Sequence, residues 1–462
     1  MKKLFAKFLI PSLILCFWTS GLAQNSFVSE QKTSRKASDR SETIPSPVAD
    51  NHTHIHSEIL SAHITDPLDP EVKLPDELNQ LIRNKEIWGG REKHSAALLA
   101  DLYTKDALVL SPSPPTWLRG EKALRFIINS TRTNKLMPTV YEVIGDAGYI
   151  AGYQKVGEGA ATKYINNFHY VVKKNNAGKW QIASEVFTVD PPRVPKALTA
   201  DQLIKDLDAA GIKRGVVLSV AYMFGSATRK PPEDEYAKVR AENDWIAEQV
   251  ARYQDRLVGF CSFNPLKDYA IEELNRCAKN PRFKGVKLHL GNSGVDIRQN
   301  PQHVEKIRQV FRVANEKRLA IVIHFWISPA YETEGGEHAR VFLNQILPEA
   351  PDITVQIAHM AGGGRSTDTA MEVFANAIVA GDRRTKNIYF DTATLTAGQT
   401  EEGLRKDAQR MRQIGLKRIL YGTDMAPPHP PARQSWELFR TRVPLTAKEF
   451  RKIAGNIAPY LR

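Results

Sequence analysis

Cysteine is scarce in this chain of 462 residues, which has only three. Cys16 lies in the N-terminal apolar segment, so Cys261 and Cys277 remain in the body of the chain. No two cysteines have the CxxC spacing of zinc or redox motifs, which excludes those sites. Because Cys261 lies in an apolar run and Cys277 in a helical pattern, we expect two separate buried thiols rather than a disulfide.

Long hydrophobic runs are absent beyond the N-terminus, so we expect no membrane-spanning segment in the mature chain. The start combines a basic segment (MKKLFAK), an apolar segment too short for a permanent span (FLIPSLILCFW) and small residues in GLAQ. This predicts a signal peptide over residues 1–23, cleaved after Ala23, and a periplasmic or secreted protein. A lipoprotein signal would use Cys16, but Leu15 stands where a small residue is expected. Residues 24–47, rich in Ser, Lys and Pro, are predicted to be a disordered leader.

The chain also lacks a concentrated basic stripe, although positive charge is in excess. The formal net charge is +13, and loss of Lys2, Lys3 and Lys7 with the signal leaves +10. The basic residues are scattered, without an arginine row or interleaved aromatic residues. This pattern argues against a nucleic-acid partner and favours an acidic small-molecule substrate or an envelope surface.

Short apolar runs alternate with amphipathic helical patterns from about residue 198 onward. They recur about every 30 to 40 residues, which is typical of βα units. The runs are GVVLSV (215–220), LVGFCSF (257–263), GVKLHL (285–290), LAIVIHF (319–325), ITVQIAHM (353–360), NIYFDTA (387–393) and RILYGTD (418–424). With the strand entering VADNHTH they make eight, which predicts an α/β fold with a closed (β/α)8 TIM barrel. A doubly wound open sheet is the alternative, but no GxGxxG follows the first strand.

A long gap separates the first predicted strand, which ends near His54, from the second, which begins at Gly215. A barrel connection needs roughly 30 residues, so we divide the chain into a first barrel strand (48–76), an inserted domain (77–189) and the remaining barrel (190–462). Helical patterns in the insertion precede strand-period alternation with NNAGK as a hairpin turn, which predicts an α+β cone. LYTKDALVLSP, GEKALRFI and NNFHYVVKKNNAGKWQIASEVF resemble the NTF2-like or SnoaL-like family, which includes isomerases, ligand binders and dimerisation modules.

The place of the insertion suggests a role. The connection after the first strand of a (β/α)8 barrel emerges on the active-site face. We therefore expect the inserted domain to be a lid that narrows substrate access or the contact of a homodimer. The alternative is an accessory domain held away on proline-containing linkers. Asp106 and His169 are candidates for an acid–base pair in the cone, although structural roles are more common for such residues.

Three of the chain's 12 histidines alternate in VADNHTHIHSE. In a strand, side chains at i, i+2 and i+4 share a face, so His52, His54 and His56 can converge on one cation. A surface histidine run is the alternative, and distant partners must decide.

Those partners stand at three other strand ends. His324, His359 and Asp424 end LAIVIHF, ITVQIAHM and RILYGTD, at the side where barrel enzymes build their active sites. Imidazole and carboxylate ligands suit a divalent metal, and we expect one Zn²⁺, with Fe²⁺ or Mn²⁺ as alternatives.

VADNHTH, the strand-end histidines and GTDMAP together resemble the amidohydrolase superfamily, specifically its amidohydrolase-2 branch of aminocarboxymuconate-semialdehyde decarboxylase-like enzymes. LIKDLDAAGIKRGVVLSV, FKGVKLHLG, GLKRILYGTDMAP and FRKIAGNIAPYL are also similar to that branch. The resemblance covers residues 48–62 and 190–462. It implies that the metal ligands are His52, His54, His324 and Asp424. His359 matches a histidine that assists proton transfer, and His56 matches no family position.

The resemblance implies a mechanism. A divalent metal lowers the pKa of bound water toward about 7. Asp424 would hold the metal and accept the water's proton, and His359 would polarise the scissile carbonyl or act as acid and base. We therefore expect a metal-dependent hydrolase of an amide, lactone or ester. A non-oxidative decarboxylase and a catalytically silent binding protein are the alternatives.

Five further residues are predicted to contact the substrate. Lys287 and His289 share a strand face in GVKLHL. A Lys287 carbamate that bridges two metals is the alternative role for that lysine. Trp326, Arg365 and His429 lie in loops after predicted strands, where barrel enzymes recognise their substrates.

Overall fold

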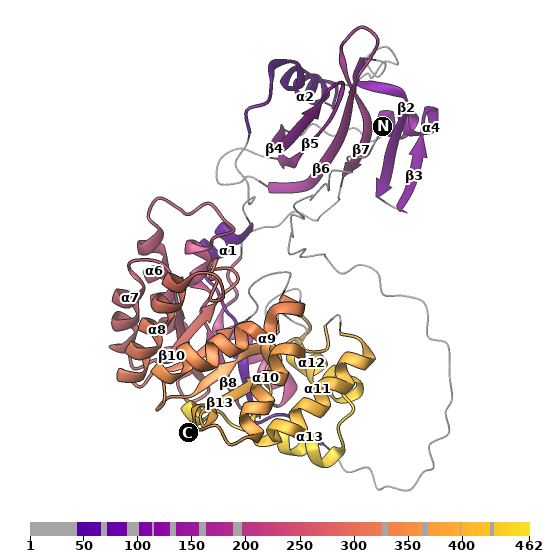
Figure 1. Cartoon of the computed structure of the whole chain (residues 1–462). Helices are drawn as coiled ribbons and strands as arrows, with labels where there is room; N and C mark the ends of the chain where they lie inside the picture. Colours follow the sequence, from indigo (N-terminus) through magenta and orange to yellow (C-terminus); the bar gives the residue numbers. More distant parts are fainter. Residues whose placement is uncertain are drawn as a thin grey trace, which may run out of the picture. The chain divides into compact units, whose positions relative to one another are not determined.

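The computed structural model describes residues 44–65, 72–89, 101–112, 115–129, 135–156, 163–187, 196–325, 331–362, 368–397, 399–425 and 429–462. It divides into a barrel unit, Met1–Ser61 with Ala197–Arg462, and an inserted unit, Ala62–Lys196 (Figure 1). The predicted signal peptide and most of the predicted leader lie outside the described residues.

Eight parallel strands form the sheet of the barrel unit, in the order in which they occur along the chain. They are β1 (Ala49–Thr53), β8 (Arg214–Leu218), β9 (Leu257–Ser262), β10 (Phe283–His289), β11 (Ala320–His324), β12 (Val355–Ile357), β13 (Ile388–Asp391) and β14 (Ile419–Leu420). The apolar runs form these strands because both sides of a barrel wall are covered; all six residues of β9 are buried. The predicted TIM barrel is confirmed.

The end of the chain's last strand completes the barrel against its first. β14 itself is short, but the ladder continues beyond it: Asn51 N donates to Tyr421 O (2.8 Å) and Asp424 N donates to His52 O (2.7 Å). Thr53 forms a further parallel bridge with Met425. The segments that carry the candidate ligands are therefore hydrogen-bonded neighbours.

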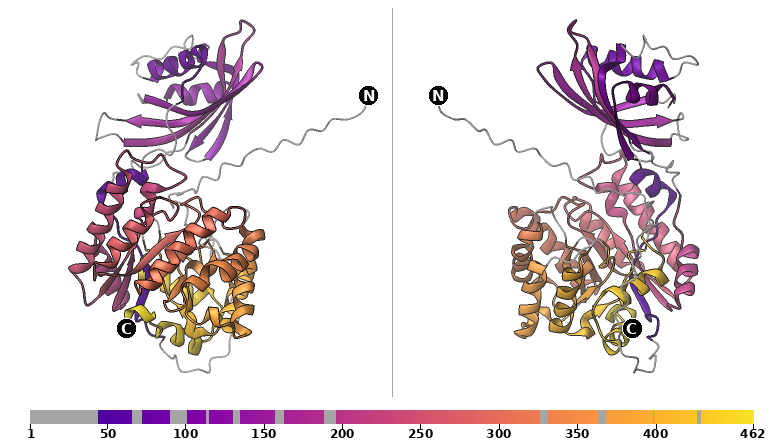
Figure 2. Two further views of the ribbon diagram at one scale, coloured as in Figure 1. Left: turned by 60° about the vertical axis from the view of Figure 1, so that its left-hand side comes forward. Right: turned by 90° about the vertical axis from the view of Figure 1, so that its right-hand side faces the viewer.

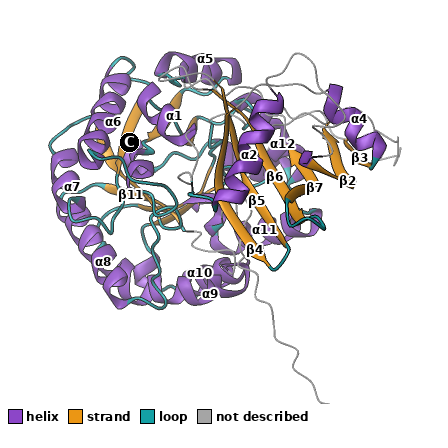
Figure 3. Cartoon of the chain, turned by 90° about the horizontal axis from the view of Figure 1, so that it is seen from above, coloured by secondary structure: helices purple, strands orange, loops and turns teal. Residues whose placement is uncertain are grey.

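Helices surround the barrel strands, as Figure 3 shows for α6, α7, α8 and α10. In α8, Asn300 caps the first turn by accepting from two backbone N–H groups, Pro301 follows it, and buried residues recur at helical spacing. The helices are α1 (Glu58–Thr65), α5 (Ala200–Ala210), α6 (Glu235–Ala251), α7 (Ala270–Ala278), α8 (Pro301–Glu316), α9 (Tyr331–Val341), α10 (Asp368–Val379), α11 (Glu401–Ile414), α12 (Ala432–Arg442) and α13 (Ala447–Ala454). Shorter helical segments are η2 (Ala221–Gly225), η3 (Phe342–Ile346), η4 (Leu347–Glu349), η5 (Ala358–Ala361), η6 (Arg383–Thr385), η7 (Leu416–Arg418) and η8 (Pro459–Leu461).

The C-terminal segment belongs to the barrel core. Ala458 and Leu461 pack in one buried cluster with residues of β1, β8, β9, β11 and β14, and Tyr460 packs against that cluster. Arg214 donates to the Leu461 carbonyl, and the ring of Tyr460 meets Phe260 edge-on at 4.9 Å. The last residues therefore fill barrel space instead of trailing from the surface.

The inserted unit is α+β, with a six-stranded sheet in the order β3-β2-β7-β6-β5-β4. Helices α2 and α4 lie on one side of this curved sheet (Figure 2) and share its apolar core. Its elements are α2 (Asp76–Gly89), β2 (Tyr103–Pro112), β3 (Pro115–Arg119), α4 (Glu121–Asn129), β4 (Lys135–Ile144), β5 (Ala147–Val156), β6 (Lys163–Lys174) and β7 (Trp180–Phe187).

Local details of the inserted unit bear on two predictions. The NNAGK turn is confirmed: the Asn175 side chain accepts from the N–H groups of Ala177 and Lys179, both at 3.0 Å. Asp106 and His169 are both exposed, whereas Phe168 and Tyr170 beside His169 are buried in the core. Neither side chain is part of the apolar core, and the acid–base pair stays an untested alternative to the structural roles that the sequence favours. The resemblance to NTF2-like domains stays a prediction.

The two remaining cysteines correct another prediction. Cys261 of β9 and Cys277 of α7 form a disulfide across 16 residues of sequence, with Cα atoms 6.4 Å apart. The expectation of two separate thiols is wrong, because packing of α7 near β9 brings the two buried side chains within bonding distance.

Within the part of the chain that the structure describes, every helix is too short or too polar to cross a bilayer.

Candidate metal centre

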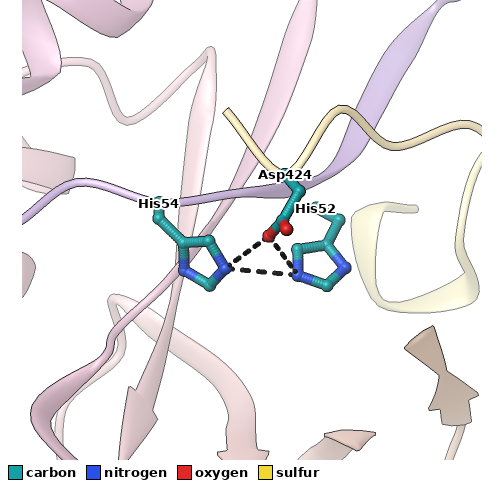
Figure 4. A group of neighbouring side chains, drawn as sticks. All are labelled: His52, His54 and Asp424. Atoms are coloured by element: carbon teal, nitrogen blue, oxygen red, sulfur yellow. Dashed lines mark hydrogen bonds and ion pairs between the residues drawn. The ribbon is translucent and has the colours of Figure 1, made fainter. Parts of the chain in front are cut away.

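Two histidines and one aspartate converge at the carboxyl ends of β1 and β14 (Figure 4). The Nε2 atoms of His52 and His54 lie 3.3 Å apart. Asp424 Oδ1 lies 3.2 Å from His52 Nε2 and 2.9 Å from His54 Nε2. The exposed fractions of the three side chains are 0%, 12% and 18%, so the group is shielded yet reachable. The structure thus brings together three of the four predicted ligands.

Neighbouring acceptors fix which ring nitrogen of each histidine is protonated. His52 Nδ1 lies 3.0 Å from a carboxylate oxygen of Asp391, and His54 Nδ1 lies 2.7 Å from the Leu218 carbonyl. Since both partners only accept, each Nδ1 carries the hydrogen. Nε2 is therefore the nitrogen of each ring that faces Asp424 and that would bind a metal, as in metal-ligating histidines.

This donor set fits a divalent cation. Two nitrogen lone pairs at 3.3 Å repel unless a proton or a cation lies between them. Burial alone would raise the pKa of Asp424, but His52 and His54 hold it well below its ordinary value, so the carboxylate is ionised. Two imidazoles and one carboxylate match the ligands and the open position of catalytic zinc sites.

His324, the fourth predicted ligand, lies farther along the same mouth. Its ring stacks on His289 with centroids 3.9 Å apart and lies 4.6 Å from the ring of His359. Its Nε2 atom is buried, and none of the described residues forms a hydrogen bond with it. Such an orphaned atom is costly unless a ligand satisfies it. His324 is nevertheless not one of the three residues whose donor atoms lie within 4.8 Å of one another.

His359 lies beside the three-residue group, with its ring 4.8 Å from that of His52. Its Nδ1 lies 2.8 Å from the Ala393 carbonyl, so the neutral ring keeps its lone pair on Nε2. Burial lowers the pKa of His359 to about 4, and the ring is neutral at pH 7. The backbone at His359 has φ 55° and at Asp424 φ 59°, a strained conformation for non-glycine residues that clusters at functional sites.

The predicted substrate-binding residues are only partly described. Lys287 is buried, with Nζ 3.3 Å from His52 Nε2. The His289 ring packs near Tyr222 at 5.1 Å, and His429 Nε2 lies 3.6 Å from Asp424 Oδ2. Trp326 and Arg365 lie outside the described residues.

His56 does not join the group. Its backbone pairs with Leu198 in an antiparallel bridge, and its Nδ1 lies 3.2 Å from the Ser57 carbonyl. The structure thus agrees with its absence from the implied ligand set.

Two buried aspartates at the site, Asp391 and Asp50, are not among the predicted site residues. Asp391, the last residue of β13, accepts from His52, and Asp50 accepts from Thr423 Oγ1 at 2.7 Å. Burial raises the pKa of Asp50 to about 7. The signal for Asp391 was available, since it ends a strand as His324 does.

Comparison with known proteins places the chain in a family. Residues 193–458, more than half of the chain, match the family model described as amidohydrolase (Amidohydro_2). The chain therefore belongs to the amidohydrolase family, in the amidohydrolase-2 branch. No curated protein sequence matches it.

Several solved structures are similar to the chain at low identity. A 2,6-dihydroxybenzoate decarboxylase from Rhizobium is 20% identical, with a TM-score of 0.40, over 55% of this chain and 85% of its own. A manganese-bound 5-carboxyvanillate decarboxylase from Novosphingobium aromaticivorans is 17% identical, with a TM-score of 0.40, over 57% and 80%. A 4-oxalomesaconate hydratase from Rhodopseudomonas palustris is 15% identical, with a TM-score of 0.38, over 56% and 82%. Likenesses this weak do not bear on substrate or metal.

Proposed function

We propose that this chain is a metal-dependent hydrolase that cleaves an amide, a lactone or an ester. The observation that carries the proposal is the ionised carboxylate of Asp424, with Oδ1 2.9 and 3.2 Å from two histidine Nε2 atoms at the catalytic end of a barrel. His52, His54 and Asp424 would hold the cation, with His324 as the further ligand. We propose zinc on the strength of this nitrogen and oxygen donor set.

The residues around the cation divide the proton chemistry. A bound divalent cation supplies Lewis-acid polarisation and lowers the pKa of water toward about 7. Asp424 accepts a proton from the attacking water, because its carboxylate is ionised. His359 is neutral, its Nδ1 is engaged by Ala393, and its Nε2 can take up a proton or orient the scissile carbonyl.

A substrate panel tests the proposal. The purified protein, loaded with zinc, is incubated with lactones, esters, amides and aromatic acids, and released acid is scored against released carbon dioxide. We expect acid release that stops when a chelator removes the metal and that is lost in Asp424→Asn. Carbon dioxide as the sole product would overturn the hydrolase proposal.

Decarboxylation is the second candidate, and Lys287 favours it. Burial lowers the pKa of Lys287 to about 8, so the amine still carries a proton at pH 7 beside the candidate ligands. Such a buried cation can bind a substrate carboxylate. If the enzyme is a decarboxylase, Lys287→Met should abolish carbon dioxide release. Two bound metal equivalents, lost together in Lys287→Ala, would instead indicate a bridging carbamate.

We also propose that the protein is exported. The N-terminal pattern supports this, and so does the Cys261–Cys277 disulfide, because disulfides persist in oxidising compartments. Cell fractionation with a tag at the C-terminus tests it. We expect the mature chain, starting after Ala23, outside the cytoplasm.

For the inserted unit we keep the lid and homodimer roles as proposals. The antiparallel bridge between His56 and Leu198 supports them. It places the start of the returning chain, Leu198, beside His56, which is two residues beyond the candidate ligand His54. Replacing residues 77–189 by a short linker is the test. A trimmed barrel with unchanged oligomeric state and unchanged substrate preference would refute both roles.

A further inference from the structure

Asp391 is fully buried and accepts four hydrogen bonds. One carboxylate oxygen accepts from His52 Nδ1 at 3.0 Å and from Gln356 Nε2 at 2.7 Å. The other accepts from the backbone N–H of His359 at 2.9 Å and of Ala393 at 3.2 Å. One side chain therefore holds a candidate metal ligand with one oxygen and the backbone of the candidate proton carrier with the other.

A second buried side chain holds Asp391 in turn. Gln356, in the middle of β12, has no exposed surface. Its amide nitrogen also donates to the Asn51 carbonyl at 3.1 Å, and its amide oxygen accepts from the Tyr460 hydroxyl. With acceptors on its nitrogen side and a donor on its oxygen side, the amide has one satisfied orientation.

The chain of contacts thus runs from the C-terminal segment to the candidate metal site. It begins at Tyr460 in η8, passes through Gln356 and Asp391, and ends at His52. Every member is hydrogen-bonded within the barrel interior, where such networks fix side-chain positions firmly.

We propose that Asp391 is the positioning residue of this metal site, and that Tyr460 and Gln356 hold it in place. The proposal rests on the metal-dependent function proposed above. Asp391 keeps the hydrogen of His52 on Nδ1, so that the Nε2 lone pair faces the cation, and its charge strengthens that nitrogen as a ligand. It also secures the strained backbone of His359, whose φ is 55°.

Zinc affinity of the full-length protein, measured by competition with a chromogenic chelator, tests the proposal. We expect Asp391→Asn to weaken zinc binding about 10- to 100-fold, the range typical of outer-shell partners. Tyr460→Phe removes a single hydroxyl from a ring that stays in place, and should weaken binding by a smaller factor. In histidine-labelled metal-free protein, the ¹⁵N signals of His52 should report a changed tautomer in Asp391→Asn.

Two matched variants serve as controls. Asp407→Asn neutralises a buried aspartate on helix α11, and Tyr421→Phe removes a buried hydroxyl that donates to Ala432. Both can lower the melting temperature of the metal-free protein, yet both should leave zinc affinity unchanged. This separates positioning from general stability.

The outcomes are distinguishable. If the natural protein binds zinc and Asp391→Asn binds it equally well, with unchanged His52 signals, the positioning role is refuted. If the natural protein binds no divalent metal, the proposed function fails first. Should Asp391→Asn not fold, Tyr460→Phe decides, and unchanged affinity in that variant refutes the chain of contacts.

Discussion

The barrel and the inserted domain both bury polar groups, but they arrange them in opposite ways. In the barrel, the Nε2 atoms of His52 and His54 face each other at 3.3 Å, and like lone pairs converge. In the inserted domain, Lys85 Nζ lies 3.3 Å from Glu185 Oε2, and the Tyr103 hydroxyl donates to the same carboxylate. The first arrangement needs a proton or a cation between the converging atoms, whereas the second is balanced by itself.

This difference separates a site from a structural cluster. Burial of a charge is tolerated when a partner is supplied, and the Lys85–Glu185 pair supplies its own. The two nitrogens and the carboxylate of the barrel group instead form a site that a cation from solution would complete, as in metal sites. Burial of polar groups alone therefore does not indicate a functional site. What distinguishes the two clusters is whether their converging groups repel or attract each other.

The largest effect should come from the barrel group. His52→Ala, His54→Ala, His324→Ala and Asp424→Asn should each remove most bound metal and most turnover. The loss should exceed the 10- to 100-fold typical of outer-shell variants, because each residue supplies one of few ligands. Metal analysis by mass spectrometry and steady-state rates measure it. Full metal content and activity in any two of these variants would contradict the assignment.

Disrupting the Lys85–Glu185 pair should lower the stability of the inserted domain and leave metal binding unchanged. Glu185→Ala removes the carboxylate that Lys85 and Tyr103 share, and breaking a buried ion pair costs about 3–5 kcal/mol. Calorimetry should show a lower melting temperature for the inserted domain, and metal analysis should show unchanged metal content. Loss of metal in this variant would show that the two regions are not independent.

Removing the disulfide of the barrel should have a slightly smaller effect on stability. Replacing Cys261 and Cys277 by alanine opens a loop of 16 residues and should lower the free energy of unfolding by about 3 kcal/mol. Denaturant unfolding of oxidised, reduced and substituted protein measures it. Two free thiols in the unreduced, unfolded protein would contradict the bond.

The smallest effect concerns pH. Glu242 accepts from Ser57 N at 3.0 Å, and burial raises its pKa from 4.5 to about 7. The folded state therefore binds more protons than the unfolded state between these values, and stability falls as pH rises from about 4.5 to 7. Glu242→Gln should flatten that slope. Above pH 7 its free energy of unfolding should exceed that of the natural protein by at most about 3 kcal/mol. If the free energy of unfolding depends on pH equally in the natural protein and in Glu242→Gln, the prediction is contradicted.

Sequence patterns were sufficient for the barrel because its strands are buried on both faces and recur at βα spacing. They also pointed to His52, His54 and Asp424, since residues at strand ends meet on one face of a barrel. Asp391 escaped notice because a lone aspartate after a strand is equally typical of a turn.

Other features depend on three-dimensional packing that no local pattern encodes. The Cys261–Cys277 bond requires α7 to pack near β9, which the spacing of two cysteines does not reveal. The link from Tyr460 to Gln356 joins residues 104 positions apart. The exposure of His169 follows from which face of β6 meets the helices.

The closing ladder between β1 and the end of β14 has a consequence for folding. Asp50 and Thr423, which flank the ligands and hydrogen-bond each other, are 373 residues apart in sequence. The first strand to be synthesised must therefore wait for almost the last segment before the barrel is complete, a high-contact-order step that is intrinsically slow. Because that seam carries His52, His54 and Asp424, the ligands assemble only when the seam forms. Metal uptake would then report the final stage of folding, and partly folded chains would be spared premature metal capture.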